Sequence, residues 1–456
     1  MSQASIKTEI QVLTNSLSLD EYMHMSASLI RRLRIPVHRP LTLIFGSRRL
    51  KLSVSPIARS KGFFLRFTDR IAEQLGLMDG DLLRLTYDRR TQTLKLGPLI
   101  GVLLPRQYAS ADRPYGSMTA FCQELHVASR IYGGLVYFFT PDGITSSEVI
   151  GLRSASRSFV RMQFPIPDIV YNRLTTRKLE NTDSVQQFFT EVKSRRQGHV
   201  FNERFLDKND VFYALARNAS IRQYLPESHL FTNFAQLNNM SRRYRSVFLK
   251  PVTGSLGKGI IRVTRANGRI LCQYASMNST ITRTSSSLKK AFVTIRSKVQ
   301  GKRYLIQQGL TLISIQDRPV DFRALVQKNS KGKWTLTSIV GRIAGSRNFV
   351  SNLARGGTLC TARSALAQSN LPSSLLAAVY VRLKRAAVEI AEALDAEMPW
   401  HFAELGIDLA VDVHGKVWLL EVNSKPSKME GTPISSGKIR PSVKKTLLYS
   451  RLLAGM

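Results

Sequence analysis

Two stretches near the end of the chain decide the fold: Glu404-Leu-Gly-Ile-Asp408 and Val417-Trp-Leu-Leu-Glu421-Val-Asn423-Ser-Lys-Pro426. Apolar residues recur along both, and the polar segment 412–416 between them has the composition of a turn, which predicts a β-hairpin. Asp408, Glu421 and Asn423 interrupt the apolar pattern. Buried carboxylates are costly unless a cation neutralises them, and Mg²⁺ prefers such oxygen ligands. The three side chains are candidate metal ligands; the alternative is a surface hairpin with incidental acids.

Composition limits the class of protein. The chain has 456 residues, enough for two to three domains. Its apolar runs are strand-sized, so no membrane span is expected, and we see no secretion signal at the N-terminus. Cys122, Cys272 and Cys360 are too few and too dispersed for a disulfide framework, and the seven histidines show no zinc-binding spacing. We therefore expect a reducing, cytoplasmic location.

The charge is large and unevenly distributed. The formal net charge of +36 implies an anionic partner but says nothing about the fold. Between Ser241 and Ile390 the only acidic residues are Asp317, Asp321 and Glu389, and acidic residues become frequent afterwards. A basic segment followed by an acidic one suits a metal–nucleotide site, although most individual lysines and arginines are expected to lie on a solvated surface. Specific nucleic-acid binding is not expected, because no recognition-helix signature is present.

Three units are expected along the chain. Residues 1–97 should form a β-rich module, a small barrel or hairpin unit, after a loosely ordered or helical lead-in of about 40 residues. Residues 98–200 alternate between strand and helix patterns, which favours a small α/β layer. Residues 201–456 hold the motifs that carry chemistry, including a helix from about 372 to 394 with one apolar face.

A glycine-rich segment lies between two predicted strands: Lys250-Pro-Val-Thr-Gly254-Ser255-Leu-Gly257-Lys258-Gly259-Ile. Glycines let backbone N–H groups approach phosphate oxygens closely, and lysines add positive charge. The segment is not a Walker A loop, because its glycine spacing is too short, Gly259 replaces the hydroxyl residue and a strand follows instead of a helix. It is either another kind of phosphate-binding loop or a plain turn.

Taken together, the glycine-rich segment and the carboxylate hairpin resemble the ATP-grasp superfamily. The resemblance covers roughly residues 201–429, and its most specific elements are the segments 248–260 and 420–426. It implies a fold of mixed α+β and α/β class in which two α+β lobes clasp ATP, preceded by a pre-ATP-grasp α/β domain at 98–200 and the β-rich module at 1–97. Across the whole chain, the sequence is similar to the YheC/YheD group of endospore coat-associated proteins.

The resemblance implies roles for individual residues. One or two Mg²⁺ ions would bind Asp408, Glu421 and Asn423, with Asn352 nearby. Segments that are similar to the glutamate-adding ligases imply that Arg323 and Arg342 brace the transferred phosphate, a task that suits the guanidinium group. Gln307 stands in the interlobe hinge where an acid is often found. The residues implied to bind ATP are Lys208, Lys250, Gly254, Ser255, Gly257, Lys258, Gly259, Gln307, Gln308 and Leu310.

The reaction implied by the resemblance is Mg²⁺- and ATP-dependent joining of a carboxylate to an amine through an acyl phosphate. The excess of basic residues would suit an acidic peptide or polymer as a substrate, and the family implies association with the spore coat during sporulation. The competing interpretation is a non-catalytic ATP-binding protein with a structural or regulatory role in the coat.

Overall fold

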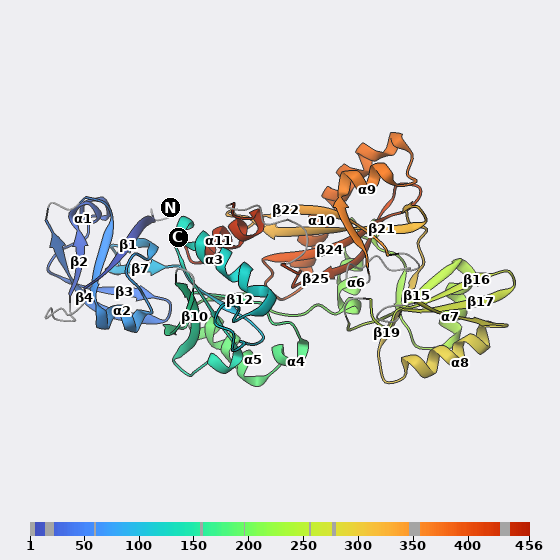
Figure 1. The fold of residues 1–456 in the computed structure, drawn as a ribbon, viewed down its shortest axis with the longest axis horizontal. Coiled ribbons are helices and arrows are strands. Elements are labelled where there is room, and N and C mark those ends of the chain that lie inside the picture. Colours follow the sequence, from blue (N-terminus) through green and yellow to red (C-terminus); the bar gives the residue numbers. More distant parts are fainter. Residues whose placement is uncertain are drawn as a thin grey trace.

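The computed structural model describes residues 5–13, 22–58, 61–155, 158–195, 197–254, 257–275, 280–345, 356–428 and 438–456. Within these ranges a barrel and three sheets follow one another along an elongated molecule (Figure 1). No helix in the described parts is long and apolar enough to cross a membrane.

The chain begins with a closed barrel in the strand order β1-β5-β2-β4-β3-β7-β6. Its strands are β1 (Ile6–Leu13), β2 (Tyr22–Ser26), β3 (Pro40–Phe45), β4 (Arg48–Ile57), β5 (Phe64–Thr68), β6 (Leu82–Asp88) and β7 (Thr93–Gly97), with the helices α1 (Ala27–Leu33) and α2 (Asp69–Leu75). The expected loosely ordered or helical lead-in is wrong for β1 and β2. Both strands lie in the barrel, because Ile10, Met23 and Met25 bury their side chains in its core.

The second layer is a sheet in the order β11-β10-β9-β8-β12-β13. Its elements are β8 (Leu99–Leu103), α3 (Thr119–Tyr132), β9 (Leu135–Phe139), β10 (Glu148–Ala155), β11 (Ser158–Pro165), β12 (Ile169–Asn172), α4 (Arg177–Glu180), α5 (Asp183–Thr190) and β13 (His199–Phe201). One face shares a core with the barrel through residues such as Tyr137 and Phe164. The other face packs against α3 and the final helix, α11 (Pro441–Leu453), which therefore belongs to this layer.

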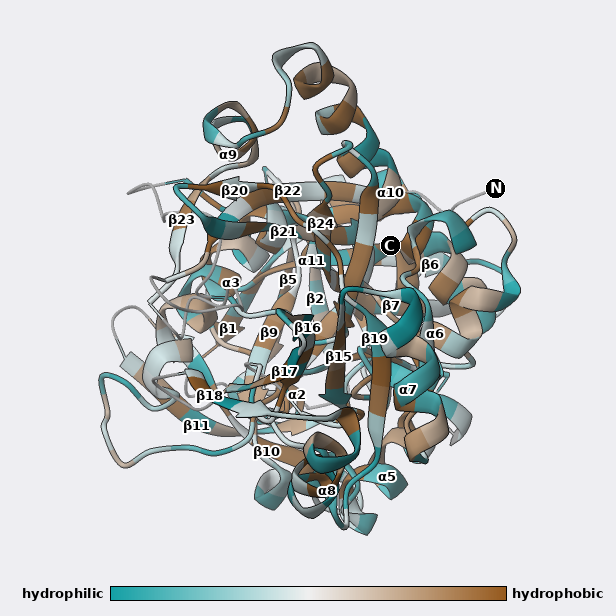
Figure 2. Cartoon of the chain, turned by 90° about the vertical axis from the view of Figure 1, so that its right-hand side faces the viewer, coloured by the Kyte–Doolittle hydropathy of each residue, from teal (hydrophilic) through white to brown (hydrophobic). Residues whose placement is uncertain are grey.

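The third sheet forms a separate lobe, at the lower right of Figure 1, in the order β14-β19-β15-β16-β17-β18. Its elements are β14 (Ser228–Leu230), α7 (Phe234–Arg243), β15 (Ser246–Pro251), β16 (Ile261–Ala266), β17 (Arg269–Ala275), β18 (Thr280–Ser285), α8 (Leu288–Val299) and β19 (Tyr304–Gln308). Val247 and Leu249 point into the core with α7 and α8, so Phe248 and Lys250 point to the opposite face. Figure 2 shows the hydrophobic colouring of β15 and β19 and the hydrophilic surface of α7.

The fourth sheet has the order β23-β22-β21-β24-β25, with β20 paired to β21. Its elements are α6 (Lys208–Arg217), β20 (Ser314–Ile315), β21 (Arg318–Lys328), β22 (Trp334–Ile343), β23 (Thr358–Thr361), α9 (Ala362–Gln368), α10 (Leu376–Glu397), β24 (Glu404–Val411) and β25 (Val417–Asn423). The helix expected at about 372–394 is present as α10, and it buries Val379, Leu383 and Ile390 against the sheet. The expected hairpin is also present, because β24 and β25 pair in antiparallel fashion.

A buried ionic cluster joins the second and fourth sheets. Glu404 is 1% exposed. It accepts hydrogen bonds from Tyr171 at 2.5 Å and from Arg173 at 3.2 Å, and it pairs with Lys428. Burial alone would raise the pKa of Glu404, but the charges of Lys428 and Arg173 lower it. Because β24 carries both Glu404 and Asp408, this cluster fixes the strand that presents the first candidate metal ligand.

Candidate active site

The three candidate metal ligands lie on one face of the fourth sheet. Asp408 is directly opposite Glu421 in the β24–β25 ladder, and Gly406 is opposite Asn423. Side chains that are directly opposite in an antiparallel pair share a face, as do residues two apart on a strand. Asp408 is buried, whereas Glu421 and Asn423 are partly exposed. The structure thus brings two carboxylates and one amide onto the same face of this sheet.

Two arginines from neighbouring strands meet Asp408. Arg323 on β21 lies opposite it and contacts both carboxylate oxygens, with 3.0 Å between Nη2 and Oδ2. Arg342 on β22 places Nη2 3.1 Å from the same Oδ2 and Nε 2.6 Å from Asp321 Oδ1. Burial alone would raise the pKa of Asp408, but Arg323 and Arg342 hold it below its ordinary value. Asp408 is therefore an anion inside the fold.

Two lysines approach the same face from other elements. Lys208 begins α6, and its Nζ lies 3.0 Å from Glu421 Oε1 and 3.0 Å from the carbonyl oxygen of Gly254. Lys250, at the end of β15, donates to Gln307 Oε1 at 2.5 Å. Burial lowers the pKa of Lys250 to about 8, with Glu421 opposing this shift and Lys208 adding to it. Lys208 therefore connects the loop after β15 to the carboxylate hairpin, whereas Lys250 bonds to Gln307 within the third sheet.

A cavity of about 110 Å³ lies between the third and fourth sheets. Phe248, Leu312 and Leu420 supply apolar walls. Its full lining is Phe248, Lys250, Ile260, Gln307, Gln308, Leu310, Leu312, Pro319, Asp321 and Leu420. An apolar slot with a few convergent polar groups is typical of a small-molecule site. Of this lining, Lys250, Gln307, Gln308 and Leu310 were expected from the sequence. Asp321 and the apolar walls were missed, the walls because isolated apolar residues on strands look like ordinary core positions.

Two backbone N–H groups of the hinge already make hydrogen bonds within the protein. The N–H of Gln308 donates to Glu227 O at 2.8 Å, and the N–H of Gly309 donates to Ser246 O at 2.9 Å. The N–H groups of Gln308, which is one of the residues implied to bind ATP, and of the adjacent Gly309 therefore already have partners. Gln307 is also engaged, because its Nε2 donates to Ser228 Oγ at 2.8 Å while its Oε1 faces Lys250.

The glycine-rich segment turns between β15 and β16. Gly259 has a φ of +74°, and a side chain there would meet Pro251 and the Tyr304 hydroxyl at 3.2 Å. The same hydroxyl donates to the carbonyl oxygen of Gly259 at 3.2 Å. Gly254 and Gly257 also have positive φ values, and Lys258 is exposed. Ser255 and Asn352 lie outside the described residues.

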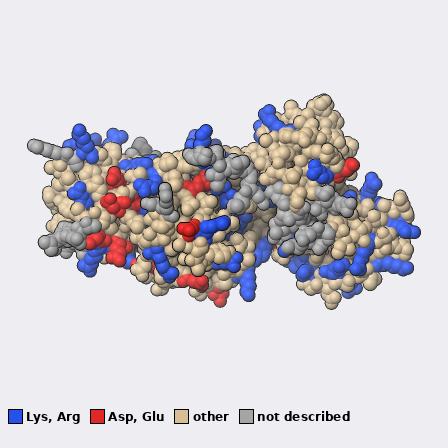
Figure 3. Space-filling model, viewed as in Figure 1, with Lys and Arg blue, Asp and Glu red and all other residues tan. Residues whose placement is uncertain are grey.

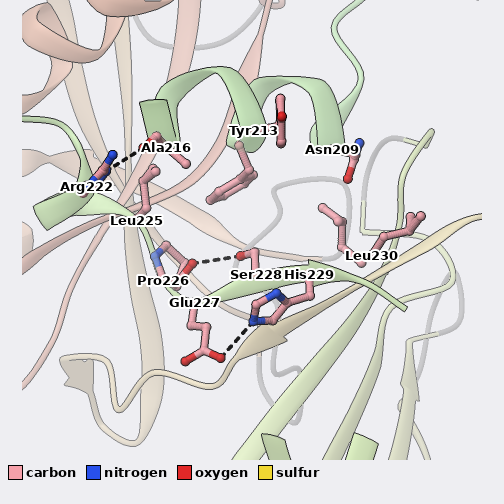
Figure 4. Close-up of a pocket in the computed structure, with 12 residues that line it drawn as sticks. Asn209, Tyr213, Ala216, Arg222, Leu225, Pro226, Glu227, Ser228, His229 and Leu230 are labelled. Atoms are coloured by element: carbon pink, nitrogen blue, oxygen red, sulfur yellow. Dashed lines mark hydrogen bonds and ion pairs between the residues drawn. The ribbon is translucent and has the colours of Figure 1, made fainter. Parts of the chain in front are cut away.

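A second pocket, of about 430 Å³, lies between α6 and β14 (Figure 4). Tyr213, Glu227 and His229 line it, and Glu227 pairs with His229 at 2.9 Å. Ser228 links this pocket to the first cavity, because it lines the pocket and accepts the hydrogen bond from Gln307. The ATP-binding residues expected from the sequence are absent from the described lining of this second pocket.

Comparison with known proteins identifies the family. The model of the YheC/D-like ATP-grasp family matches residues 197–453. The chain belongs to this family. The ATP-grasp fold expected from the sequence is thereby confirmed, and ATP-grasp proteins bind ATP together with Mg²⁺.

Two relatives come from Bacillus subtilis (strain 168). The endospore coat-associated protein YheD is 30% identical over 339 residues, which are 74% of this YheC/D-like chain and 74% of YheD. The endospore coat-associated protein YheC is 24% identical over 275 residues, which are 60% of this chain and 75% of YheC.

Two solved structures match most of this chain at low sequence identity. D-alanyl-alanine synthetase A from Vibrio cholerae matches 78% of this chain and 99% of its own, with 13% identity and a TM-score of 0.45. The D-cycloserine synthetase DcsG matches 77% of this chain and 99% of its own, with 14% identity and a TM-score of 0.46.

Proposed function

We propose that this protein is an ATP-dependent carboxylate–amine ligase that works through an acyl phosphate. The observation that carries the proposal is the meeting of charged side chains from both lobes beside an apolar cavity. Lys208 contacts both Glu421 and the glycine-rich loop, so the hairpin and the loop face one another. Family membership supports nucleotide binding at this place.

In this proposal the cavity takes the adenine, with Phe248 and Leu420 against its faces. Lys208 and Lys250 bind phosphate oxygens, and the loop of Gly254, Ser255, Gly257, Lys258 and Gly259 covers the β- and γ-phosphates. The N–H groups of Gln308 and Gly309 already have partners. Leu310, which lines the cavity just beyond them, is therefore our candidate for a backbone contact with the adenine edge.

The residues present fit Mg²⁺. Asp408, Glu421 and Asn423 share one face and offer only oxygen-containing ligands, the type that this ion prefers. Among the described residues no group of three His, Cys, Asp or Glu side chains could hold a metal, so the amide of Asn423 is needed as the third ligand. When bound, Mg²⁺ would neutralise charge on the phosphates.

The chemistry has two steps. A carboxylate oxygen of the first substrate attacks the γ-phosphorus, the bond to the β-phosphate oxygen breaks, and ADP leaves. The amine of the second substrate then attacks the acyl carbon, loses a proton and expels phosphate, which leaves an amide. Arg323 and Arg342 stabilise the transferred phosphoryl oxygens, and Asp408 holds both guanidinium groups in place beforehand. Positioning and electrostatic stabilisation of this kind are the main contributions a protein makes to phosphoryl transfer.

Calorimetry with Mg·ATP tests the nucleotide site. The wild type should bind, and Glu421→Gln and Lys250→Ala should each bind at least about tenfold more weakly. Lys416→Ala is the matched control, because Lys416 lies at the far end of the same hairpin and stacks on Trp418. If the wild type does not bind Mg·ATP, the proposed function is wrong.

A second assay tests ligation. Mixtures of carboxylates and amines should release ADP, and hydroxylamine should trap the acyl phosphate as a hydroxamate. The names of YheD and YheC place those relatives at the spore coat, so we also propose that this protein associates with the coat of sporulating cells. Mg·ATP binding with no substrate-dependent ADP release would favour a non-catalytic role there.

A further inference from the structure

The lobe that carries the glycine-rich loop is almost free of acidic residues, and Glu227, which precedes β14 and pairs with Arg243, lies at its border. Residues 228–308 include fifteen lysines and arginines and neither aspartate nor glutamate. Thirteen of these cations are exposed, whereas Lys250 and Arg262 are partly buried. Figure 3 shows this lobe, at the lower right, with blue atoms recurring over its surface. The active site uses Lys250 and Lys258, so most of this charge has no role in the proposed reaction.

The edge of this lobe is an unpartnered strand. β18 pairs with β17 alone, and within the described residues no strand pairs with its other edge. All six of its residues are exposed or partly exposed, and Ile281 is 49% exposed. A free edge presents backbone N–H and C=O groups that can accept an additional strand.

Cations surround this edge in a way that favours an acidic strand. Arg283 lies within β18, and Lys289 and Lys290 follow in the first turn of α8. Cations at a helix N-terminus oppose the helix dipole, so these two lysines do not stabilise α8. A second copy of this chain is a poor partner, because pairing two β18 strands would bring the cations of both lobes together.

We propose that β18 and the N-terminus of α8 form a docking site for an acidic polypeptide segment, which binds in extended conformation as an added strand. Backbone hydrogen bonds to β18 would give the pairing, and glutamate or aspartate side chains would meet Arg283, Lys289 and Lys290. The proposal concerns binding and does not depend on turnover of ATP. It would bring an acidic peptide to the lobe that also carries the glycine-rich loop.

Fluorescence anisotropy on the full chain tests this proposal with three types of labelled peptide, four peptides in all. The probe is a repeat of glutamate and valine, the neutral control is a repeat of glutamine and valine, and the third type is the acidic repeat N-methylated at alternate amides. Two methylated versions are needed, since either set of amides can face β18. The acidic repeat should bind about tenfold or more tightly than the neutral one, and one methylated version should bind about tenfold more weakly.

Matched charge reversals locate the site. Arg283→Glu, Lys289→Glu and Lys290→Glu together should abolish binding of the acidic repeat. Reversal of Arg31 and Arg32 on α1 and of Arg49 on β4, which are also exposed, should leave it within about twofold. Retained Mg·ATP binding shows that the first triple variant is folded.

Three results would overturn the proposal. The first is equal weakening by the two triple variants, and the second is tight binding of both methylated peptides. The third is equally tight binding of a single-stranded nucleic acid of similar charge. Each would show that the peptide responds only to diffuse charge.

Discussion

Desolvation of the Lys250 ammonium group makes nucleotide affinity depend on pH. It lowers the pKa of this group to about 8 in the free protein. Phosphate oxygens beside the ammonium group would raise that pKa again, since an adjacent anion favours the charged form. The protonated form binds, so affinity must fall as the pH rises. We expect the Kd for Mg·ATP to be nearly constant below pH 7, about twofold larger at pH 8 and about tenfold larger at pH 9, a loss of ~1.4 kcal/mol.

Calorimetry at several pH values measures both the Kd for Mg·ATP and the number of protons taken up on binding. In two buffers of different ionisation enthalpy, binding at pH 8 should take up about half a proton per nucleotide. Lys250→Arg is the control, because a guanidinium stays charged over this range and should remove both the proton uptake and the pH dependence. A Kd that is constant from pH 7 to pH 9, without proton uptake, would refute the reasoning.

Three other substitutions test the remaining features. Gln307→Glu should move the loss of Mg·ATP affinity to higher pH, because a carboxylate in place of the amide raises the pKa of Lys250; an unshifted pH profile would contradict this. Gly259→Ala should weaken Mg·ATP binding, because the added methyl group would be in close contact with Pro251 and Tyr304. Gly268→Ala is the control and should bind normally, because Gly268 has a similar φ of +71° but open space around it. Equal binding by both variants would count against a role of the glycine-rich turn in holding nucleotide. Glu404→Ala should lower the free energy of unfolding in urea by about 3–5 kcal/mol, because it leaves buried cations unpaired, while Glu148→Ala at a half-exposed ion pair should cost less than about 1 kcal/mol.

The parts that could be predicted from the sequence are those that local pattern determines. The hairpin of β24 and β25 joins neighbouring segments through a short polar turn, so its alternation already places Asp408 and Glu421 on one face. The glycine-rich turn after Lys250 could be predicted for the same reason, because it too is formed by residues that are close together in the sequence. In both cases the residues that define the feature lie within about twenty positions of one another.

Composition and spacing alone could not predict the partners of these residues, because the partners come from distant segments; it was the family resemblance that implied Arg323 and Arg342 at the site. Arg323 reaches Asp408 across 85 positions, and Tyr171 reaches Glu404 across 233. Nothing in the composition of either segment specifies which arginine or tyrosine will be opposite which carboxylate. β1 was missed for a related reason: its neighbours β5 and β6 follow much later in the chain, and its outward residues are polar.

The position of α11 has a consequence for synthesis of the protein. Val443, Leu447 and Tyr449 complete the hydrophobic core on one face of the second sheet. Pro441 follows Phe201, the last strand residue of that sheet, by 240 positions. At a translation rate of roughly 5–20 residues per second, this face has α3 but not α11 as a covering helix for roughly 12–48 seconds while the ATP-grasp lobes emerge from the ribosome. The second sheet is thus finished last although it is made early, and a chaperone that shields apolar surface would have most to do during that interval.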